Sequence, residues 1–173
     1  MHEDPRPLLR ARAVAIINPT AGGAQPGEVA NVLRRHLPGI KIVETTKEDI
    51  CGELVREALA AGADLIIAAG GDGTVSAVAN ALVGSGLPLA IIPRGTANVL
   101  VRELAVPVEL DEAVTLASSG GLTRTIDAIK VRDRHYFTQV GVGIDAFMIR
   151  DTTHEQKRRF GRVAYLWTAC VRL

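Results

Sequence analysis

The sequence predicts an α/β protein with a parallel, Rossmann-like sheet, followed by the start of an incomplete β-rich second domain. Three observations favour this fold class. Short apolar runs alternate with segments of helical period as far as residue 116. Three of these runs end in polar loops that contain glycine. After Gly120-Gly121 the alternation stops and extended segments begin. We therefore expect an α/β domain over residues 1–121 and the opening of the second domain over residues 122–173.

The composition limits the classes of protein that the chain can represent. Its 173 residues are 47% hydrophobic but only 3% aromatic, so the core must be aliphatic. A net charge of +1 argues against a general attraction to nucleic acid. No run approaches the roughly 20 apolar residues of a membrane span, and no signal peptide is recognisable. We expect a cytoplasmic protein that is at most peripheral to the inner face of a membrane.

The chain opens with a leader and a first strand–helix unit. Residues 1–12 are polar and contain two prolines, so we expect a loose leader. Ala13 to Ile17 is an apolar strand candidate, and the Asn-Pro pair after it breaks the strand. Pro26 suits the first position of a helix, whose apolar residues share one face until Pro38-Gly39 ends it.

The next units contain the most hydrophobic segment of the chain. Residues 40–44 predict a short strand, and Thr46 with Asp49 resembles a capping box for a helix that Gly62 ends. Leu65 to Ala69 is a continuous apolar run rich in β-branched residues. Such a run is typical of a strand that is buried on both faces of a parallel sheet.

The rest of the α/β segment follows the same alternation. From Val75 the apolar residues fall on one face of a helix. Residues 88–92 predict another buried strand, and residues 99–104 and 111–116 predict helices that Pro107 separates.

The last segment has a different pattern. Residues 123–131 and 136–142 are extended in character and predict a hairpin through the polar turn from Arg132 to His135. Residues 155–173 predict a helix that begins with basic residues. Because a truncated β-rich domain would expose strand edges, a homodimer is a further expectation.

Polar loops follow three of the predicted strands, at Asn18–Gly23, Gly70–Thr74 and Pro93–Asn98. In a parallel sheet, ligands bind beyond the carboxyl ends of the strands, so the three loops predict one site. Glycine lets the backbone turn tightly and approach a ligand closely. The helix that follows the second loop offers free N–H groups and the positive end of its dipole to a phosphate.

Common nucleotide motifs fit these loops poorly. A P-loop needs a Gly-Lys pair, and the sequence has none. Gly71-Asp-Gly73-Thr-Val-Ser76 nearly matches a dinucleotide fingerprint, but serine replaces the third glycine. Arg94 also stands about twenty residues further on, where an acid would meet the ribose.

The combination of three motifs is more specific. Asn18-Pro-x-x-Gly-Gly23, Gly70-Gly-Asp-Gly-Thr74 and Pro93-x-Gly-Thr-x-Asn98, in this order, resemble the catalytic domain of the diacylglycerol kinase family. This family includes sphingosine, ceramide and bacterial lipid kinases, and the resemblance covers about residues 12–170. The second motif is shared with NAD kinases and, in variant form, with phosphofructokinases, so the resemblance implies a sheet of that type.

The resemblance implies an enzyme that transfers the γ-phosphate of MgATP to a lipid hydroxyl, of diacylglycerol or a related lipid, at a membrane surface. It implies that Asp72 organises ATP and its Mg²⁺, that Thr74 donates to a phosphate, and that Asp145 meets the substrate head group or lies in a loop. The implied nucleotide-binding residues are Asn18, Pro19, Thr20, Gly22, Gly23, Gly70, Gly71, Asp72, Gly73, Thr74, Gly95, Thr96 and Asn98.

Two positions depart from the family pattern. Val99 stands where many members have aspartate, and Arg94 stands where they have leucine. Arg94 either adds a cation near the phosphates or faces solvent. In the family a glutamate late in the second domain is thought to act as general base, and that region lies beyond Leu173. We therefore expect that the 173-residue chain does not turn over by itself.

Alternatives remain open at this stage. The second motif alone would fit a NAD kinase, and the chain could also be a non-catalytic, nucleotide-binding regulatory fragment. At the residue level, Asp72 could instead cap the helix that follows it, and Asn98 could cap the next one. His36, His135 and His154 are expected at the surface.

Overall fold

The computed structural model describes residues 3–4, 12–23, 27–46, 51–119 and 123–138, which belong to one compact unit, Met1–Thr138. The described strands are β1 (Glu3–Asp4), β2 (Ala13–Ile17), β3 (Lys41–Glu44), β4 (Leu65–Gly70), β5 (Leu89–Pro93), β6 (Thr123–Arg124), β7 (Ile129–Val131) and β8 (Arg134–Tyr136). The described helices are a short 3-10 segment, η1 (Ala21–Gly23), and α1 (Glu28–His36), α2 (Cys51–Ala60), α3 (Asp72–Leu82), α4 (Val99–Glu103) and α5 (Leu110–Ser118).

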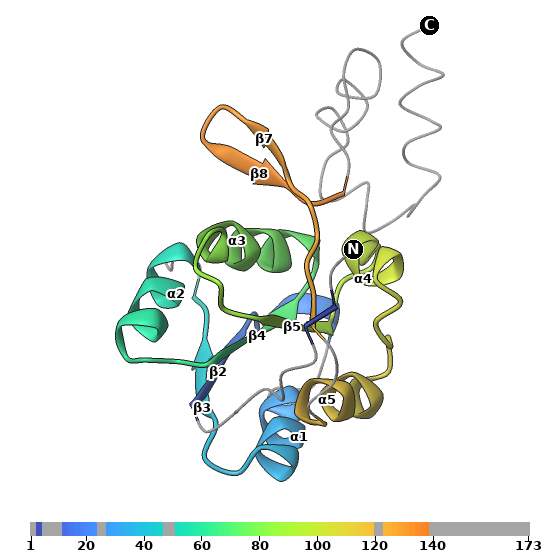
Figure 1. Cartoon of the computed structure of the whole chain (residues 1–173). Helices are drawn as coiled ribbons and strands as arrows, with labels where there is room; N and C mark the ends of the chain where they lie inside the picture. Colours follow the sequence, from blue (N-terminus) through green and yellow to red (C-terminus); the bar gives the residue numbers. More distant parts are fainter. Residues whose placement is uncertain (1–2, 5–11, 24–26, 47–50, 120–122, 139–173) are drawn as a thin grey trace, which may run out of the picture. The chain divides into compact units, whose positions relative to one another are not determined.

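Four strands form the central sheet, in the order β3-β2-β4-β5 (Figure 1). Every neighbouring pair in it is parallel, as the alternation of strands and helices predicts. The α/β fold class is therefore confirmed. The register pairs Ile17 with Ala69 and Gly70 with Pro93, so β2, β4 and β5 end at the same edge of the sheet.

Helices cover both faces of this sheet. Alternate residues of the strands, such as Ala15 and Ile67, pack with α1 and α5. The residues between them, such as Ile16 and Ile66, pack with α2, α3 and α4. All six residues of β4 are buried, which confirms a strand enclosed on both faces.

The helix ends are partly as predicted. The Schellman motif at Gly62 ends α2: Gly62 N–H donates to Leu59, Ala63 N–H donates to Ala58, and Gly62 has a φ of 77°. The prediction for Pro26 is wrong, because α1 begins at Glu28 after the left-handed Gly27. Only part of the predicted capping box lies within the described residues.

The predicted hairpin is confirmed, but its turn is tighter and its first strand shorter than expected. Strands β7 and β8 pair antiparallel, and the pair of Val131 with Arg134 leaves Arg132-Asp133 as the turn. Arg132 has a φ of 54°, the left-handed conformation that such tight turns use.

The segment before the hairpin is not one strand. Thr123–Arg124 forms β6 and pairs instead with β1. The prediction of a loose leader is therefore wrong at Glu3–Asp4, which forms β1. Asp145, His154 and the helix predicted over residues 155–173 lie outside the described residues, and the boundary after residue 121 stays a prediction. Over the ranges that the structure describes, no helix is both long and apolar enough to cross a membrane.

Candidate functional site

The three glycine-containing loops meet at the carboxyl edge of the sheet. Asn18 continues directly from β2, and its backbone N–H donates to the carbonyl of Ala69 at 2.8 Å. Arg94 N–H likewise donates to the carbonyl of Gly70 at 2.9 Å. The loops therefore leave neighbouring strands side by side, as the predicted parallel sheet requires.

The first loop is joined to the second by Asn18 and Thr74. The Asn18 amide donates to Thr74 Oγ1 at 3.2 Å. Its oxygen accepts from the backbone N–H and the hydroxyl of Thr20, at 3.0 and 2.8 Å, and so forms a local Asx turn. Thr74 is buried, and its hydroxyl keeps its own proton for a further acceptor.

The second loop packs against the third through glycine backbone. A Cβ atom on Gly95 would lie 2.7 Å from Gly71 Cα and 2.6 Å from Asn98 Oδ1. A Cβ atom on Gly70 would lie 2.6 Å from the Thr74 side chain. Side chains at these positions would force the loops apart, so glycine here permits backbone-to-backbone contact.

The first loop also reaches the third loop. Gly22 has a φ of 70°, and a Cβ atom on it would overlap the carbonyl of Arg94. The three loops thus form a continuous backbone surface, which we call the glycine cradle and define as residues 18–23, 70–74 and 93–98.

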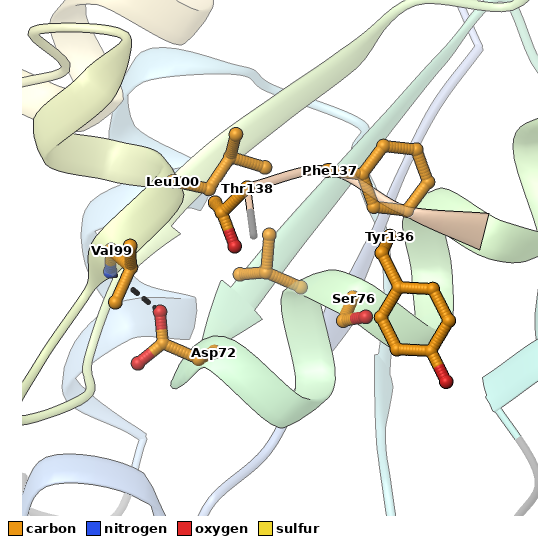
Figure 2. Close-up of a pocket in the computed structure, with 8 residues that line it drawn as sticks. Asp72, Ser76, Val99, Leu100, Tyr136, Phe137 and Thr138 are labelled. Atoms are coloured by element: carbon orange, nitrogen blue, oxygen red, sulfur yellow. Dashed lines mark hydrogen bonds between the residues drawn. The ribbon is translucent and has the colours of Figure 1, made fainter. Parts of the chain in front are cut away.

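Asp72 holds the third loop in place. One carboxylate oxygen accepts from the backbone N–H group of Asn98 at 3.0 Å. The other accepts from the backbone N–H group of Val99 at 2.6 Å (Figure 2). Asp72 lies in the first turn of α3, yet Gly71 is the N-cap of that helix. The interpretation of Asp72 as a cap of its own helix is therefore wrong, because its carboxylate faces the N-terminus of α4 instead.

Asn98 closes the third loop on itself. Its oxygen accepts from Gly95 N–H at 2.9 Å, and its amide donates to the Gly95 carbonyl at 2.7 Å. Asn98 occupies the N-cap position of α4 with a φ of 47°, but among the described contacts its side chain makes no capping bond. The prediction of a side-chain cap is wrong, although the position is the one expected.

The side chain of Arg94 is mostly buried and packs against α1. Its side chain is only 18% exposed, and Nη2 lies 3.4 Å from Glu28 Oε2 in the first turn of α1. Its Nε atom is buried without a hydrogen-bond partner among the described residues. The ion pair ties the third loop to α1, so the alternative in which Arg94 faces solvent is wrong. The alternative in which Arg94 contacts the phosphates stays a prediction.

A cavity of about 190 Å³ lies beside Asp72. Its walls come from α3, from the start of α4 and from the segment at the end of β8, and Figure 2 shows these side chains around a common space. The lining residues are Asp72, Val75, Ser76, Val99, Leu100, Tyr136, Phe137 and Thr138.

Sequence reasoning did not identify this cavity. One signal was present in α3, where Asp72, Ser76 and Asn80 follow one another at intervals of four residues. Residues at this spacing share a helix face. They form a polar line on a helix whose other residues are mostly apolar. The contribution of Tyr136–Thr138 has no comparable signal in the sequence.

The remaining predicted residues of the cradle line no cavity that the structure describes. Pro19 and Thr96 are exposed, and Gly23 ends η1. Gly73 is exposed in the first turn of α3, with open space where a side chain would stand. Within the described ranges, no cluster of three or more His, Cys, Asp or Glu side chains is placed to hold a metal ion.

Comparison with known proteins adds a family relationship. Residues 12–131 match the family model described as the diacylglycerol kinase catalytic domain. A probable YegS-like lipid kinase of Pectobacterium atrosepticum is 35% identical over an alignment of 161 positions, which covers 89% of this chain and 53% of that protein. A diacylglycerol kinase of Mycobacterium tuberculosis is 30% identical over an alignment of 164 positions, which covers 89% of this chain and 52% of the relative.

A solved structure agrees with these relatives. A diacylglycerol kinase from Bacillus anthracis strain Sterne superposes with a TM-score of 0.63 at 32% identity, over 72% of this chain and 47% of the other. The chain thus spans about half the length of these relatives.

Proposed function

The chain belongs to the diacylglycerol kinase catalytic domain family, and on this premise we propose that it is the ATP-binding part of a lipid kinase. The complete reaction would transfer the γ-phosphoryl group of MgATP to a hydroxyl of diacylglycerol or a related lipid. The acceptor would be met at a membrane surface, so the protein would attach there peripherally.

The observation that carries this proposal is the glycine cradle. Its three loops are in backbone contact, so a phosphate can approach the backbone there without intervening side chains. The first N–H groups of α3 have no acceptor within their own helix, and they lie at the positive end of its dipole. Phosphoryl transfer depends mainly on such positioning and charge stabilisation.

Asp72 is suited to an ATP-bound magnesium ion. Mg²⁺ is commonly held by one or two carboxylates together with substrate phosphates, and a separate protein cage is not needed. Each Asp72 oxygen already accepts one backbone N–H and keeps further lone-pair positions. When bound, the ion would neutralise the charge on the transferring phosphoryl group. The role of the three loops would be to hold Asp72 where the second and third loops meet.

Nucleotide titration tests the proposal. We expect the wild-type chain to bind MgATP in isothermal titration calorimetry, and Asp72→Asn to weaken binding by at least about tenfold, or about 1.4 kcal/mol. Asparagine keeps the size of the side chain but removes its charge. Asp111→Asn is the matched control, because Asp111 also lies in the first turn of a helix but is exposed and forms an ion pair with Arg35 at the surface. Equal MgATP affinity in wild type and Asp72→Asn would contradict the role of Asp72.

The acceptor class needs a second assay. Radiolabelled ATP would be supplied with mixed lipid vesicles in one arm and with NAD in the other, using the complete protein. Label in the lipid fraction is the expected result. Phosphorylated NAD would overturn the lipid kinase proposal and favour the NAD kinase alternative.

A further inference from the structure

Asn80, on α3, holds the outer edge of strand β8. Its amide Nδ2 donates to the carbonyl of His135 at 2.8 Å, and its Oδ1 accepts from the backbone N–H of His135 at 2.8 Å. The same Nδ2 also donates to the carbonyl of Ser76, one turn earlier in α3, at 3.0 Å. A single side chain thus satisfies both backbone polar groups of one strand residue while it is itself fixed to its own helix.

The hairpin geometry explains why His135 needs such a partner. In an antiparallel pair, hydrogen-bonded and non-hydrogen-bonded residue pairs alternate along the ladder. His135 is paired with Lys130, but its N–H and C=O groups are occupied by Asn80. They therefore point away from β7, toward the open side of β8. The Asn80 amide replaces the strand that would otherwise pair with this edge.

This pair of hydrogen bonds stands next to the cavity wall. Tyr136, Phe137 and Thr138 directly follow His135, and all three line the cavity. The opposite wall is the polar line of α3, where Ser76 lies one turn and Asp72 two turns before Asn80. Asn80 therefore fixes one wall relative to the helix that carries the other.

The cavity and the glycine cradle share Asp72. The first loop and residues 93–97 contribute none of the described lining residues, whereas Asp72 belongs to the cradle and to the cavity. The lining combines the apolar side chains of Val75, Leu100 and Phe137 with the hydroxyls of Ser76 and Thr138. Such a lining suits an alcohol that adjoins a hydrocarbon chain better than it suits a second polyphosphate.

We propose that Asn80 is a positioning residue, which holds Tyr136–Thr138 in place as the wall of an acceptor cavity beside Asp72. This inference rests on the proposed function for the chemistry of the ligand, the hydroxyl end of an acylglycerol. Asn80 itself does not touch the reacting groups. It acts through the backbone of His135.

The test measures two properties separately: the hydrogen bonding of the His135 backbone and the affinity for the acceptor lipid. Asn80→Ala removes both hydrogen bonds to His135 but favours the helix, so folding of α3 is not at risk. We expect the His135 amide to exchange with solvent at least tenfold faster in this variant, as followed by ¹⁵N NMR. We expect the dissociation constant for dioctanoylglycerol, a short-chain diacylglycerol, to rise about tenfold while that for MgATP stays within twofold.

Two further variants control the comparison. Asn80→Gln keeps the amide, so it should recover part of the His135 protection and part of the dioctanoylglycerol affinity. Asn31→Ala, at an exposed position of α1, should change none of the three measurements.

Several results would overturn the inference. One is unchanged His135 exchange in Asn80→Ala, and another is faster exchange with unchanged dioctanoylglycerol affinity. Failure of the wild-type chain to bind dioctanoylglycerol would also refute it. Absence of MgATP binding alone would refute the proposed function instead and leave the role of Asn80 supported.

Discussion

Gly95 illustrates what can be known of the site at the scale of single residues. The motif Pro93-x-Gly-Thr-x-Asn98 indicates that the backbone at Gly95 comes close to another group, since glycine is the residue that permits close approach. The structure identifies the neighbours as the Gly71 backbone and the Asn98 side chain. Asn98 is held by two hydrogen bonds to Gly95, and the Gly71 carbonyl accepts from Val75 N–H, so neither neighbour can move aside easily.

Gly95→Ala should therefore disturb both the fold and the nucleotide site. The added methyl group would lie within 2.7 Å of two constrained groups, and we expect a loss of about 1–3 kcal/mol in the free energy of unfolding. MgATP affinity should fall as well, because the second and third loops must separate. Urea denaturation and calorimetry measure the two effects.

Gly52→Ala provides the matched control. A Cβ atom on Gly52 in α2 would meet only ordinary contacts, the nearest at 3.6 Å. Alanine also favours a helix, so we expect a gain of about 0.4–1 kcal/mol. If Gly95→Ala were as stable as Gly52→Ala, the tight packing of the two loops would be refuted.

At the scale of elements, periodicity predicts where strands and helices lie but less well where they end. The apolar run of β4 was sufficient to predict burial on both faces. The start of α3 was placed too late, because its first turn, Asp72 to Thr74, has no apolar period. The first hairpin strand was predicted too long, since alternation continues where pairing with its partner does not, and the second was placed too late, because Arg134 and His135 were assigned to the turn.

Substitutions in β4 test its double burial. Ile66 and Ile67 are consecutive and point to opposite faces of the sheet, yet both are fully buried. We expect Ile66→Ala and Ile67→Ala each to lower the free energy of unfolding by about 2–5 kcal/mol. Ile129→Ala, in the hairpin at 50% exposure, should change it by no more than about 0.5 kcal/mol. A small effect at either β4 position would contradict burial on both faces.

At the scale of the whole molecule, the core that the described residues form lies within the compact unit Met1–Thr138. Its buried apolar residues run from Ala13 to Ala117, and Phe137 packs against one of the two core clusters. Both faces of the sheet are therefore covered by segments of the same unit.

A fragment of residues 1–138 should consequently fold alone. We expect a single cooperative transition in urea, followed by circular dichroism, with a slope appropriate to a unit of this size. We also expect the fragment to bind MgATP, because all three loops of the cradle are included. A broad, non-cooperative transition would show that residues 139–173 are needed to complete the core.

The sequence by itself determined the α/β class, the buried strands, the three glycine loops and the family. These features depend on short-range periodicity and on residue types within single loops. Only the tertiary structure decided which groups the polar side chains contact. Asp72 meets Asn98 across 26 positions, Asn80 meets His135 across 55, and Arg94 meets Glu28 across 66. Each contact depends on how helices and loops pack around the sheet, because a hydrogen bond forms only when both groups are brought within about 3 Å. Local pattern cannot specify that distance.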